Sequence, residues 1–275
     1  GGNDDGSGGL NAMFIAYERL LGLNYLRTTG SDAEATSSRA KWDLMTGANH
    51  TDASPFQAWM WKRHAGFDVV AYTGNAMTGR QMPHSMGVTP EMMWVKKRSS
   101  SSDGNWSVYH KGMNGGTDPE DYYMNLNDSA AEINNFYRWA DTAPNSTYFT
   151  LGTSGSVNDS GQTYIAMLFA SVAGISKVGS YSGSSYDVTI NLGFTPRFLI
   201  VKAYNPASGS QRWNMFDSLR GMGAGSNDKR IYLDSTDGQQ TGDYITSVSA
   251  TGITMKTNYS YTNSNGNEYI YYAHA

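Results

Sequence analysis

The chain has 275 residues, which is enough for two ordinary domains with cores of their own. Charged residues make up only 16% of it, against 31 Gly and 19 Tyr, and this composition predicts a turn-rich all-β protein with a neutral, aromatic surface. The net charge of −4 argues against binding to nucleic acid, the absence of Cys excludes disulfides and thiolate chemistry, and no apolar run is long enough for membrane insertion.

Residues 1–9 have the Gly-rich composition of a flexible linker. A calcium-binding loop at Asp4 and Asp5 is the alternative, but the ligand spacing of known calcium loops is missing. The chain begins with two Gly and no Met, so we expect it to be a processed or incomplete piece of a longer polypeptide.

Residues 10–65 are rich in helix formers, yet they match later stretches of the chain. The matches, in chain order, are Tyr17-Glu-Arg-Leu-Leu-Gly22 with Phe216-Asp-Ser-Leu-Arg-Gly221, Tyr25-Leu26 with Tyr232-Leu233, and Phe56-Gln-Ala-Trp-Met-Trp61 with Tyr164-Ile-Ala-Met-Leu-Phe169. We therefore predict the back half of a β repeat whose front half is absent. Half a sandwich leaves a sheet edge open, and we expect upstream strands, a neighbouring subunit or the later repeats to cover it.

A ten-residue pattern of Gly, apolar residue, Thr-Pro, one charged residue, four apolar residues and Lys occurs twice. The copies are Gly87-Val-Thr-Pro-Glu-Met-Met-Trp-Val-Lys96 and Gly193-Phe-Thr-Pro-Arg-Phe-Leu-Ile-Val-Lys202. Pro90 and Pro196 stand where a strand can start without a ladder hydrogen bond. Four consecutive apolar side chains point alternately to opposite faces, so the pattern predicts a core strand that is covered on both faces.

Other landmarks recur in the same order around this strand. Trp106-Ser-Val-Tyr109 matches Trp213-Asn-Met-Phe216, Tyr123-Met124 matches Tyr232-Leu233, and the stretch from Gly161 to Ala170 matches the stretch from Gly266 to Ala275. A repeat of this size indicates duplicated domains. Trp106 and Trp213 align with each other, so we expect them, with Pro90 and Pro196, to belong to the core framework.

We therefore predict tandem antiparallel β-sandwich, jelly-roll-like domains at 66–173 and 174–275, each around its own aromatic core and preceded by the partial copy at 10–65. Predicted strands of the first full copy fall near 67–73, 80–86, 91–97, 105–110, 121–126, 147–152 and 163–170. Those of the second fall near 176–182, 187–192, 197–203, 212–217, 229–234, 244–249, 252–257 and 267–274.

Four stretches of the chain resemble a domain family of tailed bacteriophages that is abundant in aquatic phages. They are Gly66-Phe-Asp-Val-Val-Ala-Tyr-Thr-Gly74, Asn105-Trp-Ser-Val-Tyr-His110, the stretch from Trp139 to Gly152, and the stretch from Val172 to Gly183. Members of this family lie near the C-termini of long virion proteins. The sequence from Ala12 to Arg19 departs from the family pattern, and the first copy lacks its opening strands.

The resemblance implies a structural virion protein on the particle surface, in a tail fibre or a host-attachment appendage that contacts glycan receptors. It implies a homo-oligomer, most readily a trimer, with other virion proteins as partners. The alternatives are a capsid-decoration or filament subunit without host contact and, less favoured, a glycan-degrading enzyme. The family carries no established site residues, and a shared fold does not assign a function.

No catalytic, metal or cofactor site is predicted from the residues. The five His lack metal-ligand spacing. Asp118, Glu120 and Asp121 are candidates for the paired acids of a glycosidase, but a solvated acidic loop explains them more simply.

Three aromatic residues without a partner in the other copy, Trp42, Tyr137 and Trp139, fall in predicted loops. There they are candidates for stacking on sugar rings, because they offer flat apolar area at little cost in conformational entropy. The alternative is that they close the ends of their own sandwich or lie in a subunit interface.

Overall fold

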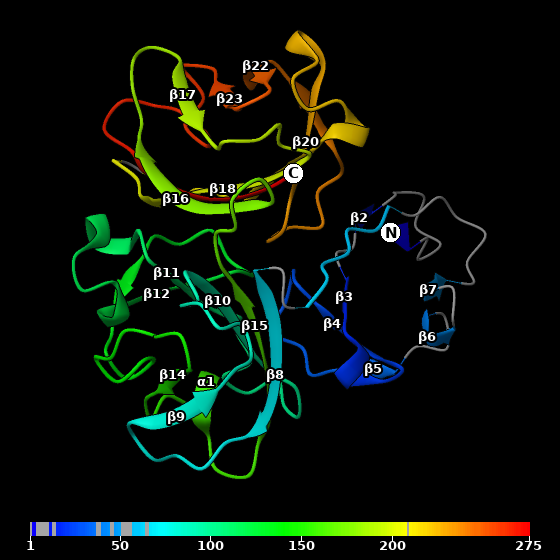
Figure 1. Cartoon of the computed structure of the whole chain (residues 1–275), viewed down its shortest axis with the longest axis vertical. Helices are drawn as coiled ribbons and strands as arrows, with labels where there is room; N and C mark the ends of the chain where they lie inside the picture. Colours follow the sequence, from blue (N-terminus) through cyan, green and yellow to red (C-terminus); the bar gives the residue numbers. More distant parts are fainter. Residues whose placement is uncertain are drawn as a thin grey trace.

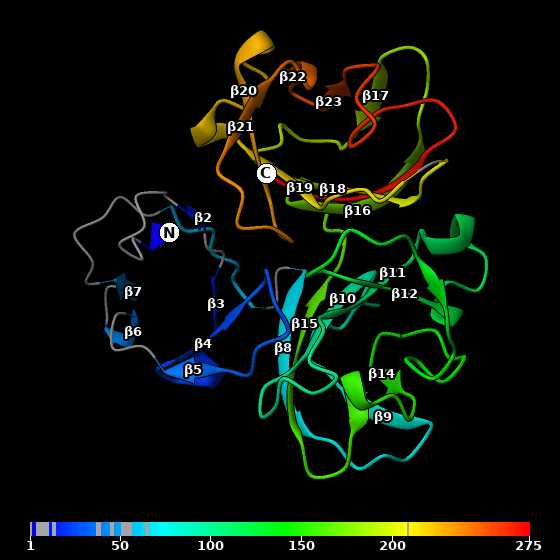
Figure 2. The same ribbon diagram turned by 180° about the vertical axis from the view of Figure 1, so that it is seen from behind.

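The computed structural model describes residues 2–3, 11–12, 15–36, 40–44, 47–50, 57–63, 66–207 and 209–275. These residues form an almost entirely β structure of antiparallel sheets, which confirms the predicted all-β, sandwich-type fold. Three lobes lie around a common centre, as Figures 1 and 2 show. We name them lobe 1 (residues 15–63), lobe 2 (66–172) and lobe 3 (174–275). None of the helices in the described part of the chain is long and apolar enough to cross a membrane.

Lobe 2 consists of a six-stranded sheet and a two-stranded sheet. The large sheet has the order β13 (Ile133–Asn134), β12 (Tyr122–Asn125), β11 (Ser107–His110), β10 (Met92–Lys97), β15 (Thr163–Phe169) and β8 (Phe67–Thr73). The small sheet pairs β14 (Tyr148–Leu151) with β9 (Arg80–Pro83). Two 3-10 turns, η2 (Met113–Gly116) and η3 (Pro119–Asp121), and the short helix α1 (Gly155–Asn158) connect the strands.

Lobe 3 repeats the strand order of the large sheet and adds one strand to the small sheet. Its large sheet has the order β21 (Gln240–Gly242), β20 (Asp228–Tyr232), β19 (Asn214–Asp217), β18 (Phe198–Asn205), β24 (Glu268–His274) and β16 (Ser176–Ser182). Its small sheet joins β17 (Val188–Asn191), β23 (Gly252–Met255) and β22 (Ile245–Ser249). The 3-10 turns η4 (Ser218–Arg220) and η5 (Gly225–Asn227) separate β19 from β20.

The described part of lobe 1 contains a smaller copy of the same motif. Strands β3 (Ile15–Tyr17), β4 (Asn24–Arg27) and β5 (Ala35–Thr36) pair in the order of β19, β20 and β21, with η1 (Arg19–Leu21) after β3 as η4 follows β19. Strands β6 (Ala40–Leu44) and β7 (Gly47–His50) form a hairpin. The calcium alternative at Asp4 and Asp5 lies outside the described residues, as does most of the linker at 1–9. Of this stretch the structure describes β1 (Gly2–Asn3), which pairs with β2 (Asn11–Ala12).

The register of the strands corrects one alignment made from the sequence. Val108 pairs with Met124, and its counterpart Met215 pairs with Ile231, so Met124 corresponds to Ile231 and not to Leu233. Leu26, opposite Ala16, likewise corresponds to Ile231. The connection has the same length in both lobes, since Val108 and Met124 are 16 positions apart, as are Met215 and Ile231. The sequence alignment was misled because a Tyr followed by an apolar residue occurs at 123–124 and again at 232–233.

Strands β10 and β18 are buried on both faces, as their apolar runs predict. In β10, Met93 and Val95 pack between the two sheets of lobe 2, whereas Met92 and Trp94 point to the centre of the molecule. In β18 the same alternation places Leu199 and Val201 inside lobe 3, and Phe198 and Ile200 at the centre. Pro90 and Pro196 are buried just before these strands.

The central core is continuous through all three lobes. It includes Leu21 and Leu26 of lobe 1, Trp106 and Leu126 of lobe 2, and Trp213 and Leu233 of lobe 3 among its buried side chains. Each full copy also has an aromatic core of its own, and the shared central core is an addition that the sequence did not predict. Each large sheet has a second apolar face, and burying that face requires the neighbouring lobes.

Equivalent tryptophans connect each full copy to the copy before it. The Trp106 indole N–H donates to the Arg27 carbonyl oxygen at 2.8 Å, and the Trp213 indole N–H donates to the Asn125 carbonyl oxygen at 2.9 Å. Arg27 and Asn125 occupy the same place in their repeats. Arg27 pairs with Ile15, two residues before Tyr17, and Asn125 pairs with Ser107, two residues before Tyr109. Both tryptophans are buried, as predicted for the core framework.

Equivalent lysines reinforce these junctions. Lys96 Nζ donates to the carbonyl oxygens of Ser31 at 3.0 Å and Asp32 at 2.6 Å, and Lys202 Nζ donates to those of Ser129 at 3.0 Å and Gln211. Both lysines are fully buried, and desolvation lowers the pKa of each to about 8. Lys96 and Lys202, the last residues of the two copies of the ten-residue pattern, thus bind each lobe to the lobe before it.

Lobes 1 and 3 also meet, so the three lobes form a closed ring. Thr28 Oγ1 donates to the Leu233 carbonyl oxygen at 2.9 Å, and Gln57 Nε2 donates to Asp217 Oδ1 at 2.7 Å. Among the described residues no strand of the later repeats pairs with the sheet of lobe 1, so what covers its open edge stays a prediction.

Candidate functional site

The three aromatic residues predicted to contact glycan are not brought together. Trp139 is fully buried, packs edge-on against Tyr109 at 6.1 Å, and donates its indole N–H to the Tyr122 carbonyl oxygen at 3.0 Å. It is part of the lobe 2 core, so its assignment to a sugar-binding surface is wrong. The surrounding turns look like a loop in sequence, but they fold back across the end of the sandwich.

Tyr137 is 53% exposed and lies beside the half-exposed Phe136, with ring centroids 4.2 Å apart. Its exposure is compatible with the predicted surface role. Trp42 lies in β6, and its side chain is outside the described part of the structure.

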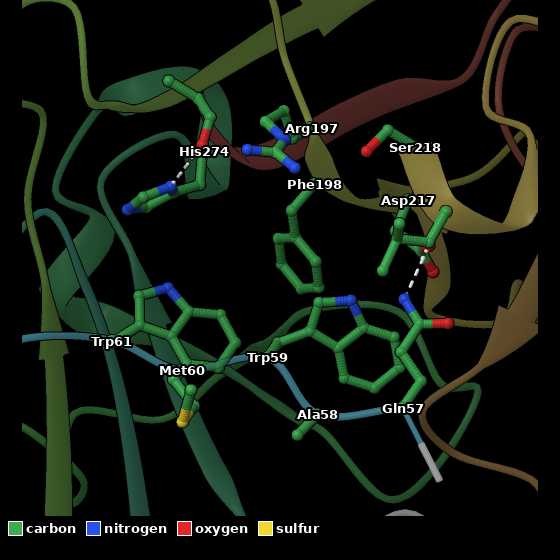
Figure 3. A pocket seen from close by; sticks show the side chains of 12 residues that line it. Gln57, Ala58, Trp59, Met60, Trp61, Arg197, Phe198, Asp217, Ser218 and His274 are labelled. Carbon is green, nitrogen blue, oxygen red and sulfur yellow. Dashed lines mark hydrogen bonds between the residues drawn. The ribbon is translucent and has the colours of Figure 1, made fainter. Parts of the chain in front are cut away.

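A groove between lobes 1 and 3 is also lined by aromatic side chains. Residues 57–61 of lobe 1 cross the start of β18 and the turn η4, and the cavity between them has a volume of about 220 Å³ (Figure 3). We call this cavity the aromatic groove. It is lined by Gln57, Ala58, Trp59, Met60, Trp61, Arg197, Phe198, Asp217, Ser218, Leu219, His274 and Ala275.

Two half-buried indoles and a phenyl ring form one side of the aromatic groove. The Trp61 ring lies edge-on to Phe198 with centroids 5.3 Å apart, and Trp59 is tilted against the same ring at 5.9 Å. Trp61 also donates its indole N–H to the Tyr272 hydroxyl at 3.0 Å. These contacts fix both indoles against the central core while leaving part of each accessible.

Polar groups line the opposite side of the aromatic groove. Asp217 accepts hydrogen bonds from Gln57 and from the Arg220 backbone N–H, and it forms an ion pair with the Arg220 guanidinium at 2.6 Å. That guanidinium also lies over the Trp59 ring, 4.9 Å from its centroid. Arg197, Ser218 and the carboxamide of Gln57 add hydrogen-bonding groups near the opening (Figure 3).

Sequence reasoning missed this groove because Trp59 and Trp61 align with strand residues of the other copies. In the complete lobes this strand is β15 or β24, paired on both sides, and three of the four equivalent residues, Met167, Phe169 and Tyr272, are buried, whereas His274 is partly exposed. In lobe 1 residues 57–62 form no strand, so the two indoles take part in a surface instead. The sequence feature that could have indicated the groove is the pair Trp59 and Trp61, since the matching strand β15 has Met167 and Phe169 at these positions.

One protein family matches most of the chain. Its model covers residues 28–275, and it is described as a domain of unknown function, DUF7483. The chain belongs to the DUF7483 family. No curated protein and no solved structure matches it. The DUF7483 match starts at the end of β4 and spans lobes 2 and 3, so the family unit is larger than a single β-sandwich lobe.

The acids of this DUF7483 chain do not assemble into a metal centre within the described residues. Asp118, Glu120 and Asp121 belong to the turn η3 and its N-cap on the surface of lobe 2. Partial desolvation and the neighbouring Asp141 raise the pKa of Asp121. The arrangement has no opposed pair of acids across a cleft in this loop, which a glycosidase requires.

His110 gives the DUF7483 chain a pH-dependent contact between lobes 2 and 3. It is fully buried, its Nδ1 accepts from the Gly112 N–H at 3.0 Å, and its Nε2 faces the Tyr271 carbonyl oxygen at 3.2 Å. This pattern fits the neutral ring with its proton on Nε2. Burial lowers the pKa of His110 to about 4.

We expect this histidine to destabilise the chain in acid. The unfolded chain gains a proton on His110 as the pH falls below the ordinary value of about 6.5, whereas the folded chain does not until about pH 4. Stability is therefore lost between these values, by about 3 kcal/mol. Denaturant unfolding at several pH values should show this loss, and His110→Gln should show a flatter profile. The burial of Asp234 acts in the opposite direction in part of this range, but it is common to both proteins, so equal slopes would contradict the prediction.

Proposed function

We propose that this chain is a structural, non-catalytic module of a tailed-phage virion, in a tail fibre or a host-attachment appendage. Its role is to hold surface groups in fixed relative positions on the particle surface. The likeness of four stretches of its sequence to phage appendage domains supports the proposal. The architecture described above supports it independently of that likeness.

The observation that carries the proposal is the repetition of the same contacts at two of the three junctions of the ring, between lobes 1 and 2 and between lobes 2 and 3. A Trp indole and a Lys ammonium of one lobe donate to backbone carbonyls of the preceding lobe, once from Trp106 and Lys96 and once from Trp213 and Lys202. Such buried contacts leave little freedom of rotation between lobes. Rigid modules of this kind suit an appendage, since many weak receptor contacts act together only when their geometry is maintained.

Within this proposal, the aromatic groove is the surface that contacts host glycan. Aromatic rings on one side stack on the apolar face of a sugar, and the carboxylate, guanidinium and amide groups on the other side bind its hydroxyls. The exposed pair of Phe136 and Tyr137 is a second contact point on lobe 2. Self-association, most readily into a trimer, and binding to other virion proteins would multiply these contacts.

The experiment that tests the virion role is immunogold electron microscopy of the phage that encodes the chain. Antibodies raised against the purified chain should label the tail fibres or another appendage of intact particles. Labelling of the capsid or of the length of a filament would favour the alternative of a decorating or filament subunit. Particles that carry no label and lack the chain by mass spectrometry would overturn the proposal.

We expect Trp59→Ala to weaken glycan binding by about tenfold, which corresponds to roughly 1.4 kcal/mol for the loss of one stacking ring. The measurement is binding to a glycan array, followed by titration of the best ligand. Arg197→Ala on the polar side is a second variant with little effect on the core. Tyr186→Ala is the matched control, because Tyr186 is 80% exposed and does not line the groove. Equal binding by all four proteins would remove the groove from the proposal, and shortened glycan chains would favour the enzyme alternative.

A further inference from the structure

A polar cleft lies where lobe 2 meets lobe 3, away from the aromatic groove. It has a volume of about 530 Å³, and its wall combines two residues of η2 and one residue after β12 with residues of β16, β18 and β24. The lining residues are Asn114, Gly115, Glu132, Ser180, Tyr181, Ser182, Tyr204, Asn205 and Glu268. Two carboxylates, Glu132 from lobe 2 and Glu268 from lobe 3, therefore share this cleft.

The junction between lobes 1 and 2 contains the counterpart of this cleft, but there an ion pair fills it. Glu34 accepts from Arg98 in two places, with Nε to Oε2 at 2.9 Å and Nη2 to Oε1 at 3.3 Å. The Glu34 backbone N–H also donates to the Arg98 carbonyl oxygen at 2.8 Å. Both side chains are mostly shielded from solvent.

The same backbone contact identifies the corresponding residues at the second junction. The Glu132 N–H donates to the Tyr204 carbonyl oxygen at 2.8 Å, so Glu132 corresponds to Glu34 and Tyr204 corresponds to Arg98. The guanidinium is thus replaced by an uncharged phenol, while the carboxylate is kept. Glu268 adds a further negative charge to the second junction. It precedes Tyr269 in β24, and the residue that precedes the matching Tyr164 in β15 is the neutral Thr163.

Neither carboxylate of the cleft has a basic partner in the part of the chain that the structure describes. Glu132 Oε2 accepts from the Asn114 N–H at 2.8 Å, and Glu268 Oε2 accepts from the Ser182 hydroxyl at 2.9 Å. Burial raises the pKa of Glu132, as expected for a carboxylate that is desolvated without a cation beside it. The first junction is neutral in charge at these positions, whereas the second carries two uncompensated negative charges.

We propose that the cleft between lobes 2 and 3 binds an arginine side chain of a partner protein, whose guanidinium takes the place that Arg98 has at the junction between lobes 1 and 2. The chain itself provides the template, because the equivalent carboxylate already binds this group in two-point geometry. A guanidinium is planar and carries five N–H donors, so it can pair with Glu132 and still donate to Glu268 or to the hydroxyl and amide oxygens around it. The inference does not depend on glycan binding or on the position of the chain in a virion.

Titration of the purified full chain with N-acetyl-L-argininamide tests this proposal, with binding followed by NMR. Saturable shifts are expected for amides around the cleft, and N-acetyl-L-citrullinamide, the neutral analogue of similar shape, should bind at least about tenfold more weakly. Glu132→Gln should weaken binding of the arginine compound by about the same factor, since it removes the paired charge. Glu34→Gln is the matched control at the filled junction and should leave the affinity unchanged.

Glu268→Gln provides a second variant if Glu132→Gln lowers the melting temperature, because Glu268 is the first residue of β24 and is only partly buried. The proposal is overturned if the wild-type chain does not bind the arginine compound, if the citrulline compound binds equally well, or if neither cleft variant reduces the affinity. Tight binding of Ca²⁺ in preference to the arginine compound would also overturn it, because the cleft would then be a cation site of another kind.

Discussion

Replacing Trp213 by alanine is expected to lower the free energy of unfolding by about 3–5 kcal/mol, the usual cost of removing a buried tryptophan. Trp213 is 1% exposed and packs in the core that all three lobes share. Its loss creates a cavity and also leaves the Asn125 carbonyl oxygen without its indole donor. Because this contact joins lobe 3 to lobe 2, we expect the loss to appear as one cooperative shift of the whole transition in urea.

Trp213→Phe separates the two contributions. It keeps most of the apolar surface but removes the indole N–H, so the expected loss is about 1–3 kcal/mol. Trp106→Ala makes the same change at the first junction and should have a similar effect, since Trp106 is equally buried and donates to Arg27. If Trp213→Ala unfolded lobe 3 alone and left a second transition unchanged, the lobes would not form one cooperative unit.

Lys202→Met is expected to lower the free energy of unfolding by about 3 kcal/mol at neutral pH. The methionine fits the apolar part of the site, but it leaves the Ser129 and Gln211 carbonyl oxygens unpaired, and each buried unpaired acceptor costs roughly 1–3 kcal/mol. It also removes the charge that partly offsets the burial of Asp234, whose pKa is raised to about 6 by desolvation. Denaturant unfolding measures the difference.

Lys62→Met is the control, because Lys62 is exposed and a surface substitution of this kind changes stability by no more than about 0.5 kcal/mol. The opposite outcome has a clear physical meaning. Desolvation lowers the pKa of Lys202, which shows that burying its charge is costly. If Lys202→Met were more stable than the wild-type chain, this cost would exceed the value of the carbonyl contacts, as happens for some buried ion pairs.

The predicted strands of the two full copies correspond closely to the observed ones, and the reason lies in a few residues. Pro90 and Pro196 set the start of the central strands, and Trp106 and Trp213 mark the next strand in each copy. The stacked pairs Tyr72 with Tyr164 and Tyr181 with Tyr269 recur in both lobes as well, which explains why the sequence repeats them. Residues that recur in the same order in both copies therefore locate the strands better than the strand propensity of any single residue.

The duplicated glycines have a similar explanation. Gly74 and Gly183 close the same turn, and a Cβ atom at either position would lie about 2 Å from the backbone oxygen of Asp159 or Ser264, respectively. Only glycine permits that approach. The sequence could identify these positions as special, but not which backbone they contact.

The candidate site was much less accessible to sequence reasoning. Trp139 was assigned to the surface because the turns around it read as a loop, and its burial depends on how those turns fold over the sandwich. Trp59 and Trp61 were assigned to a strand, but the described residues 57–62 form none, and both indoles stay partly exposed beside the groove. Local pattern does not determine either outcome, because both depend on which distant segment covers the side chain.

The amino-acid sequence by itself determined the all-β class, the duplication, the central strands and the need to cover both of their faces. These properties follow from side-chain alternation and from turn residues, which act within a few positions of one another. Only the tertiary structure decided what covers the second face. The apolar side chains of Trp94 and Ile200 could have packed against a partner subunit. They pack instead in the central core that the three lobes share, because a closed ring of three lobes buries this surface within a single chain.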